Sequence, residues 1–150
     1  MKLLDANLLL YAIDEASPRH RAARPWLERQ LSGEEPVAFA WVVVLAFWRL
    51  STNPHVFERP LSPDQAFEAV EHWLGQPCAV IVQPGDRHAA LVRQLLRPLG
   101  TAGNLVNDAH LAALAIEHGA DLHSCDADFS RFRGLRWVNP LDAPDHRPRR

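Results

Sequence analysis

Four aspartates in three separated parts of the chain have a residue type and a setting that suit a metal ion. Asp5 follows an apolar run at the start of the chain, and Asp126 and Asp128 follow a short strand-like run near its end. Asp108 lies near the start of a helical pattern of apolar residues. Carboxylate oxygens are the ligands that Mg²⁺ and Mn²⁺ prefer, and such ions activate water and stabilise charge in phosphodiester hydrolysis. The pattern therefore predicts a hydrolytic metal centre.

Helix capping is the competing explanation for Asp5 and Asp126. Aspartate accepts hydrogen bonds from the free N–H groups at a helix N-terminus, and for either residue alone capping explains the pattern as well as metal binding does. Both residues, however, follow a predicted strand. In an open parallel sheet the carboxyl ends of the strands form the ligand crevice, so the repeated placement favours a metal site.

Strand-like runs alternate with helical patterns along the chain. The predicted strands cover residues 1–4, 37–40, 78–82, 120–125 and 135–138, and the predicted helices cover 7–13, 19–31, 41–51, 63–75, 86–99 and 104–118. This alternation predicts an α/β fold, a three-layer α/β/α sandwich around a central, mostly parallel, four- to five-stranded sheet. We expect one domain over residues 1–141 and a disordered, polar tail over 142–150.

Composition limits the partners and the compartment. The net charge of −2 gives no global attraction to nucleic acid, so a polyanion would need local basic surfaces or metal ions. Arginines cluster locally, but solvated helix faces explain most such clusters. The only cysteines are Cys78 and Cys125, which argues against a zinc or disulfide framework and favours a reducing cytoplasm. The apolar run from Trp41 to Leu50 is too short to span a bilayer, so no membrane association is expected.

Three segments, in order along the chain, resemble the PIN-domain ribonucleases, and in particular the VapC toxins of bacterial toxin–antitoxin pairs. They are Leu3-Leu4-Asp5-Ala6-Asn7, Asn104 to Asp108 with the alanine-rich helix after it, and Ser124-Cys125-Asp126-Ala127-Asp128-Phe129. The resemblance implies that Asp5, Asp108 and Asp126 are metal ligands, that Asp128 is an accessory carboxylate, and that Asn7 and Ser124 orient the ligands.

The same resemblance implies an activity and partners. We expect an endoribonuclease that depends on Mg²⁺ or Mn²⁺ and cuts structured RNA, such as transfer or ribosomal RNA, with a metal-activated water. We also expect a cognate VapB-type antitoxin that blocks the site, and a homodimer.

One position departs from the family pattern. The family usually has a glutamate a few residues before the arginine at Arg49, and this chain has Ala46 there. Fewer anionic oxygens should weaken metal affinity. Two interpretations follow: an active nuclease with three or four aspartates, or a catalytically weakened PIN-domain protein that binds RNA or its antitoxin without cutting.

Two other enzyme classes also place an aspartate at a strand end. A dehalogenase-like phosphatase would need a second aspartate where Asn7 stands, and a receiver domain would need a late lysine, whereas Lys2 is the only lysine in the chain. The histidines in helical patterns are interpreted as structural residues rather than catalytic ones. The nuclease remains the favoured hypothesis.

Overall fold

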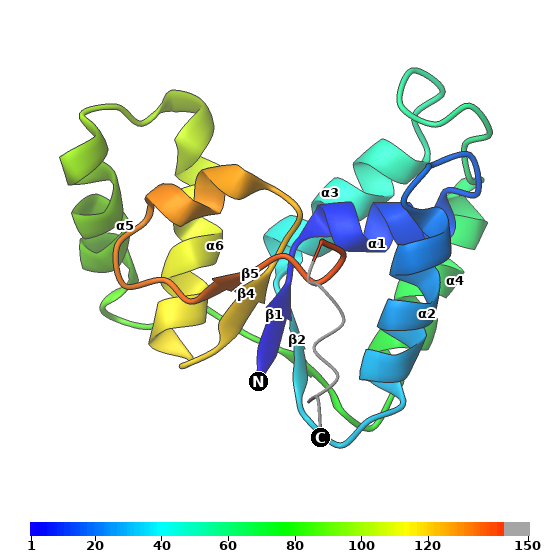
Figure 1. Cartoon of the computed structure of the whole chain (residues 1–150), viewed down its shortest axis with the longest axis horizontal. Coiled ribbons are helices and arrows are strands. Elements are labelled where there is room, and N and C mark those ends of the chain that lie inside the picture. The colour runs from blue at the N-terminus through cyan, green and yellow to red at the C-terminus, as the bar shows by residue number, and fades with distance from the viewer. Residues whose placement is uncertain (143–150) are drawn as a thin grey trace, which may run out of the picture.

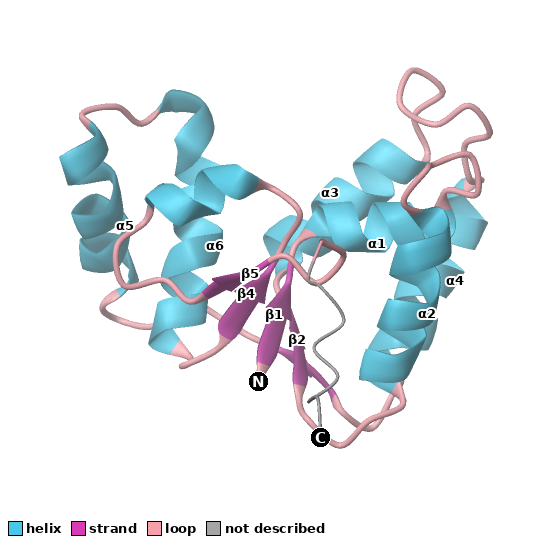
Figure 2. Ribbon diagram, in the orientation of Figure 1, coloured by secondary structure: helices cyan, strands magenta, loops and turns pink. Residues whose placement is uncertain are grey.

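The computed structural model describes residues 1–142 and contains one five-stranded sheet in the order β3-β2-β1-β4-β5. Its strands are β1 (Lys2–Leu4), β2 (Val37–Phe39), β3 (Ala79–Ile81), β4 (Asp121–His123) and β5 (Trp137–Val138). All four pairs of neighbouring strands are parallel, as Figure 2 shows in magenta. The prediction of a mostly parallel sheet is confirmed. The predicted tail lies outside the described residues, apart from its first residue.

The described residues, 1–142, include six α-helices. They are α1 (Ala6–Ile13), α2 (His20–Leu31), α3 (Trp41–Ser51), α4 (Pro63–Leu74), α5 (His88–Leu96) and α6 (Val106–Glu117). Helices α5 and α6 lie on one side of the sheet, and α1, α2 and α4 lie on the other (Figure 1). This arrangement confirms the three-layer α/β/α sandwich. Within residues 1–142, no helix has both the length and the apolar content needed to cross a bilayer.

Most helix boundaries follow local signals. Helix α4 begins where Ser62 and Gln65 form a reciprocal capping box and Pro63 occupies the first turn, because proline lacks the N–H that would otherwise need a partner there. The helix predicted over roughly 86–99 differs from the structure at its start and in the type of its last turn. It begins at His88 and changes at Arg97 to a short 3₁₀ segment, since Pro98 cannot donate the next helical hydrogen bond.

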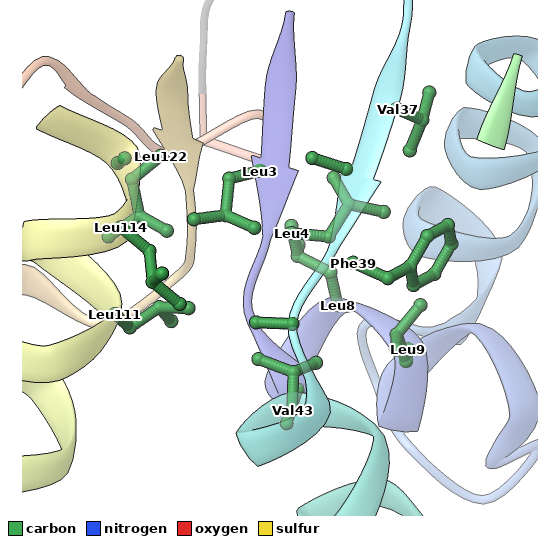
Figure 3. Close-up of a cluster of buried hydrophobic side chains, with 14 of the residues drawn as sticks. Leu3, Leu4, Leu8, Leu9, Val37, Phe39, Val43, Leu111, Leu114 and Leu122 are labelled. Carbon is green, nitrogen blue, oxygen red and sulfur yellow. The ribbon is translucent and has the colours of Figure 1, made fainter. Parts of the chain in front are cut away.

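The core forms on both faces of the central strand. Leu3 and Leu4 of β1 are fully buried, and successive side chains of a strand point to opposite faces of the sheet. Figure 3 shows Leu3 directed toward Leu122 and Leu114, on the side of α6, and Leu4 beside Leu8 of α1. Burial on both faces explains why the consecutive residues Leu3 and Leu4 are both apolar, and it fixes the strand end that Asp5 follows.

A buried histidine lies at the carboxyl end of β4. His123 is only 6% exposed and stacks on Trp26 of α2, with ring centroids 5.7 Å apart. Its Nδ1 atom has no hydrogen-bond partner within residues 1–142. Burial, with a smaller contribution from the positive charge of Lys2, lowers the pKa of His123 to about 4. The folded protein therefore holds this ring neutral well below the pH at which a free histidine takes up a proton.

This burial predicts an acid-dependent loss of stability. In the unfolded chain His123 takes up a proton as the pH falls through about 6.5, whereas the folded chain does so only near pH 4. The unfolded state thus gains protons first, and the free energy of unfolding should fall across this window. We expect wild type to lose ~2 kcal/mol more than His123→Phe between pH 7 and pH 4.5, measured by chemical denaturation. Parallel pH profiles for the two proteins would contradict the assignment.

Candidate active site

The carboxyl ends of β1 and β4 bring Asp5 and Ser124 side by side. The register pairs Leu4 with His123, so the next residue of each strand leaves the sheet at the same edge. The Ser124 hydroxyl donates a hydrogen bond to Oδ2 of Asp5 at 2.7 Å, and Oδ1 of Asp5 accepts one from the N–H of Ala6, also at 2.7 Å. Asp5 therefore caps α1 with one oxygen while its other oxygen belongs to a second network. Capping and a functional role are compatible in this residue.

Asn7 completes that network. Its side-chain amide donates to Oγ of Ser124 at 3.0 Å and to Oδ2 of Asp5 at 3.3 Å, and its Oδ1 accepts the N–H of Cys125 at 3.3 Å. The Ser124 oxygen also accepts the N–H of Asp126 at 3.0 Å. The side chains of Asn7 and Ser124 thus fix the Asp5 carboxylate and join it to the segment that carries Asp126.

The late acidic pair lies at the start of a short 3₁₀ helix, η3 (Ala127–Arg131): Asp126 precedes its first residue and Asp128 lies in its first turn. Oδ1 of Asp126 accepts the N–H of Asp128 at 2.9 Å, so Asp126 caps this helix. Asp126 is half-buried and Asp128 is exposed. Asp126 lies near Asp5, since its charge acts on Asp5 and its N–H donates to Ser124. Asp128 lies on the solvent side of the site.

Asp108 lies in the first turn of α6, close enough to the other three aspartates for their charges to act on it. Burial raises its pKa to about 6, and the charges of Asp126, Asp5 and Asp128 add to that shift. Burial also raises the pKa of Asp5, assisted by the charge of Asp126 and opposed by the hydrogen bonds from Ser124 and Ala6. Burial and the charges of neighbouring carboxylates thus make ionisation of Asp5 and Asp108 less favourable. The structure brings all four sequence-predicted aspartates into one electrostatic cluster.

A cleft of about 270 Å³ opens between α3 and α6 in front of these groups. Asp5, Asn107 and Asp108 line its acidic wall, and Ala46 and Arg49 of α3 line the opposite wall. Ala46 therefore faces the site, as expected for the position where the family carries a glutamate. Sequence reasoning did not assign Arg49 to the site, although its place one helical turn after Ala46 on the same helix is a usable signal.

The donor atoms suit a hard divalent cation, but the side chains are not gathered into a finished ligand set. Carboxylate and amide oxygens are the preferred ligands of Mg²⁺ and Mn²⁺, which also retain several waters. Within residues 1–142, no three His, Cys, Asp or Glu side chains are grouped closely enough to hold an ion. The residues fit the cation in chemistry and charge, and the carboxylates would have to move inward to ligate it.

Comparison with known proteins identifies the family. The family model for the PIN domain matches residues 2–135. This chain belongs to the PIN-domain family. It is 51% identical over 140 residues to ribonuclease VapC37 of Mycobacterium tuberculosis, covering 93% of this chain and 97% of that protein. It is 41% identical over 146 residues to VapC ribonuclease Mb2897 of Mycobacterium bovis, covering 97% and 99% of the two chains. The resemblance to VapC ribonucleases is confirmed.

Solved structures of other PIN-domain proteins share the fold. VapBC2 from Rickettsia felis, bound to a DNA fragment from its promoter, superposes with a TM-score of 0.67 at 20% identity and covers 92% of this chain and 97% of that one. M. tuberculosis VapC20, described as a Sarcin-Ricin loop cleaving toxin, gives a TM-score of 0.59 at 19% identity, covering 91% and 99%. This PIN domain therefore has the architecture of VapC toxins, and the phosphatase and receiver hypotheses are set aside.

One further acidic side chain near the strands, that of Glu35, lies outside the site. Glu35 forms ion pairs with the N-terminal ammonium at 3.1 Å and with Lys2, at the amino end of β1. It lies at the opposite end of the strand from Asp5. Glu35 therefore does not supply the carboxylate that Ala46 lacks in this PIN domain.

Ala46→Glu should strengthen cation binding, because it adds an anionic oxygen to a wall of the cleft that now has none. We expect Mn²⁺ affinity to rise on the order of tenfold, measured by calorimetry on the folded protein. Ala46→Gln is the matched control, since it adds a side chain of the same size without the charge. Equal Mn²⁺ affinity for wild type and both variants would show that position 46 is not the missing ligand position.

Proposed function

We propose that this PIN-domain protein is the ribonuclease toxin of a type II toxin–antitoxin pair, and that it cleaves structured RNA, such as transfer or ribosomal RNA, with Mg²⁺ or Mn²⁺. The observation that carries the proposal is the clustering of four aspartates beside one cleft: Asp5 and Asp108 line the cleft, and the charges of Asp126, Asp5 and Asp128 all act on Asp108. Its support is the 51% identity to a protein named ribonuclease VapC37. The description of VapC20 as a Sarcin-Ricin loop cleaving toxin favours a structured RNA substrate.

The residues of the site have different roles in the proposed reaction. Asp5, Asp108 and Asp126 would hold the ion, and Asp128 would assist from the solvent side. A bound divalent cation supplies an activated water and offsets charge on the phosphate. Hydrogen bonds from Ser124 and Asn7 hold Asp5 in one orientation, which reduces the reorganisation needed during the reaction. Asp108, with its pKa raised to about 6, is fully available as a carboxylate only above that pH.

Arg49 would bind the phosphate backbone from the other wall of the cleft. The side chain is exposed, and its guanidinium makes no hydrogen bond or ion pair with any residue in the described part of the chain. Guanidinium groups bind phosphate oxygens through two parallel N–H donors. A substrate phosphate would then lie between the Arg49 guanidinium and the acidic wall. With a divalent cation held at that wall, the phosphate would be attracted from both sides of the cleft.

Two protein partners belong to the proposal. A VapB-type antitoxin would cover the acidic cleft with a basic or amide side chain, and the VapBC complexes among the structural relatives support such a partner. A second copy of the chain would form a homodimer. Large apolar side chains that remain exposed on the cleft side of α3 and at the start of α6, namely Trp41, Leu45 and Val106, supply surface for such contacts.

The absence of a carboxylate from the α3 wall of the cleft supports a second candidate function. Because Ala46 contributes no carboxylate to the cleft, the protein could instead bind RNA or its antitoxin with little or no cleavage. This alternative keeps the fold and the phosphate contact from Arg49 but removes turnover. It is distinguished from the nuclease by cleavage measured with added Mn²⁺.

Asp5→Asn should abolish cleavage while leaving the fold intact. Asparagine caps a helix as well as aspartate does, so the contact with Ala6 survives, but the charge that would bind the cation is lost. We expect cleavage of total RNA to fall at least ~100-fold, since changes to groups behind a metal ligand already cost 10–100-fold. Asp64→Asn, in the first turn of α4, is the control. Wild-type cleavage by purified Asp5→Asn would refute the assignment.

Arg49→Gln should weaken RNA binding more than it slows the chemical step. Loss of one phosphate contact should raise KM and reduce the slope of log affinity against log salt by about one. Both are measured with a labelled RNA across a salt series. Arg29→Gln, in the last turn of α2, removes the same charge outside the cleft. If both variants behave alike, Arg49 has no specific role in binding the substrate.

A further inference from the structure

Three titratable side chains join α5 to α6 outside the acidic cleft. Nδ1 of His88 lies 3.2 Å from Oε2 of Glu117, and Nε2 of His88 lies 2.7 Å from Nδ1 of His110. The side chains of His88 and Glu117 are only 14% and 11% exposed. The two imidazole rings meet nearly edge to face, with centroids 4.7 Å apart. A nitrogen atom of each ring is thus directed at the other ring in a largely buried setting.

This cluster is separate from the acidic site, although both use α6. His110 follows Asp108 by two positions, which is about 200° around a helix. Asp108 therefore faces the cleft beside α3, and His110 faces α5. None of the three side chains of the cluster lines the cleft that contains Arg49.

Glu117 holds His88 in a defined orientation. Its Oε2 accepts the N–H of Gly85 at 3.2 Å and contacts Nδ1 of His88 at the same distance. Its Oε1 is buried and has no hydrogen-bond partner within residues 1–142. A carboxylate in this position keeps the proton on Nδ1, since that N–H can donate to it. The lone pair of the His88 ring is therefore left on Nε2, directed at His110.

We propose that Nε2 of His88 and Nδ1 of His110 form a binding site for a transition-metal cation such as Zn²⁺, with Glu117 supporting His88 from behind. Imidazole nitrogen is a preferred ligand of Zn²⁺, Ni²⁺ and Cu²⁺. A metal-binding histidine characteristically donates its other N–H to a carboxylate, which fixes the ring and raises the basicity of the ligating nitrogen. The contacts of His88 reproduce this arrangement.

The geometry requires a small separation of the rings. Zinc–nitrogen bonds of about 2.0–2.1 Å at tetrahedral angles place two ligand nitrogens about 3.4 Å apart, compared with the 2.7 Å between the two rings. Glu117 lies on the far side of the His88 ring and so stays out of the first coordination shell. This agrees with the lack of any ready group of three ligand residues within 1–142. Water would complete the coordination, so we expect a weaker site than one with four protein ligands.

Ligand chemistry separates this site from the acidic cleft. The histidine pair offers nitrogen, which favours Zn²⁺, whereas the aspartates offer oxygen, which favours Mg²⁺ and Mn²⁺. A cation held between His88 and His110 would tie the start of α5 to α6. Because it binds only the folded chain, it would raise the melting temperature. The proposal does not depend on nuclease activity.

Zn²⁺ calorimetry on the full chain in the Asp5→Asn background, which weakens the acidic site, tests the proposal. We expect one Zn²⁺ to bind, with affinity reduced at least tenfold in His88→Gln and in His110→Gln and about 10–100-fold in Glu117→Gln. His72→Gln, an exposed histidine on α4, is the matched control and should bind as its parent does. Affinity unchanged by His88→Gln and His110→Gln would overturn the site.

NMR of the histidine side chains in the wild-type protein tests the same site without any substitution, and so applies even if a variant fails to fold. With ¹⁵N-labelled histidine, Zn²⁺ should shift Nε2 of His88 and Nδ1 of His110, while Nδ1 of His88 remains protonated. The same pair should respond in Asp5→Asn. A Zn²⁺-dependent shift confined to other histidines, or no shift at all, would refute the proposal without bearing on RNA cleavage.

Discussion

The parallel pairing of β1 with β4 is the constraint on which the site depends. Lys2, Leu3 and Leu4 pair in register with the residues of β4, and both faces of β1 are buried. A slip of one residue would turn the apolar side chains to the wrong faces, so packing holds the register. That register places Asp5 next to Ser124 and allows the hydrogen bonds that join the two ends of the chain. Core packing thus fixes the position of the first carboxylate.

The site concentrates negative charge, and the raised pKa values of two of its aspartates reflect the free-energy cost. Asp108 has a pKa raised to about 6, and Asp5 is shifted in the same direction. Such shifts mean that the ionised forms are less stable here than in water. Hydrogen bonds from Ser124, Asn7 and the Ala6 N–H offset part of this cost for Asp5. The Asp108 carboxylate receives no such hydrogen bond within residues 1–142, so a nearby cation would offset a cost that the protein leaves uncompensated.

Helix α6 is the element shared by both proposed cation sites. Its first turn presents Asp108 to the acidic cleft, and its α5-facing side presents His110 and Glu117 to His88. The cleft is also asymmetric, since α3 supplies Ala46 and Arg49 opposite the aspartates. A wall with a cation and no carboxylate suits a bound phosphate more than a further metal ligand. The departure at Ala46 therefore leaves the α3 wall of the cleft with the Arg49 guanidinium and no carboxylate.

The helices, the strands and the acidic residues of the site could be predicted from the amino-acid sequence, because they depend on local signals. The span of α3 over 41–51 and the start of α4 at the capping box were both predicted from spacing and capping residues. Asp5 and Asp126 each follow a predicted strand, and the carboxyl ends of parallel strands lie at one edge of the sheet, so the two residues were predicted to lie at the same edge. These signals lie within a few residues of the features that they specify, so periodicity and capping rules can detect them.

The contacts between side chains of different layers could not be predicted in this way, because they depend on how the whole chain folds. The stacking of His123 on Trp26, the position of Arg49 opposite Asp108, and the link from Glu117 through His88 to His110 each join elements far apart in the sequence. Local periodicity indicates that a residue lies on a helix face, but not which neighbour covers that face. The neighbour is set by strand order and by the packing of helices on the sheet, which is a property of the whole chain.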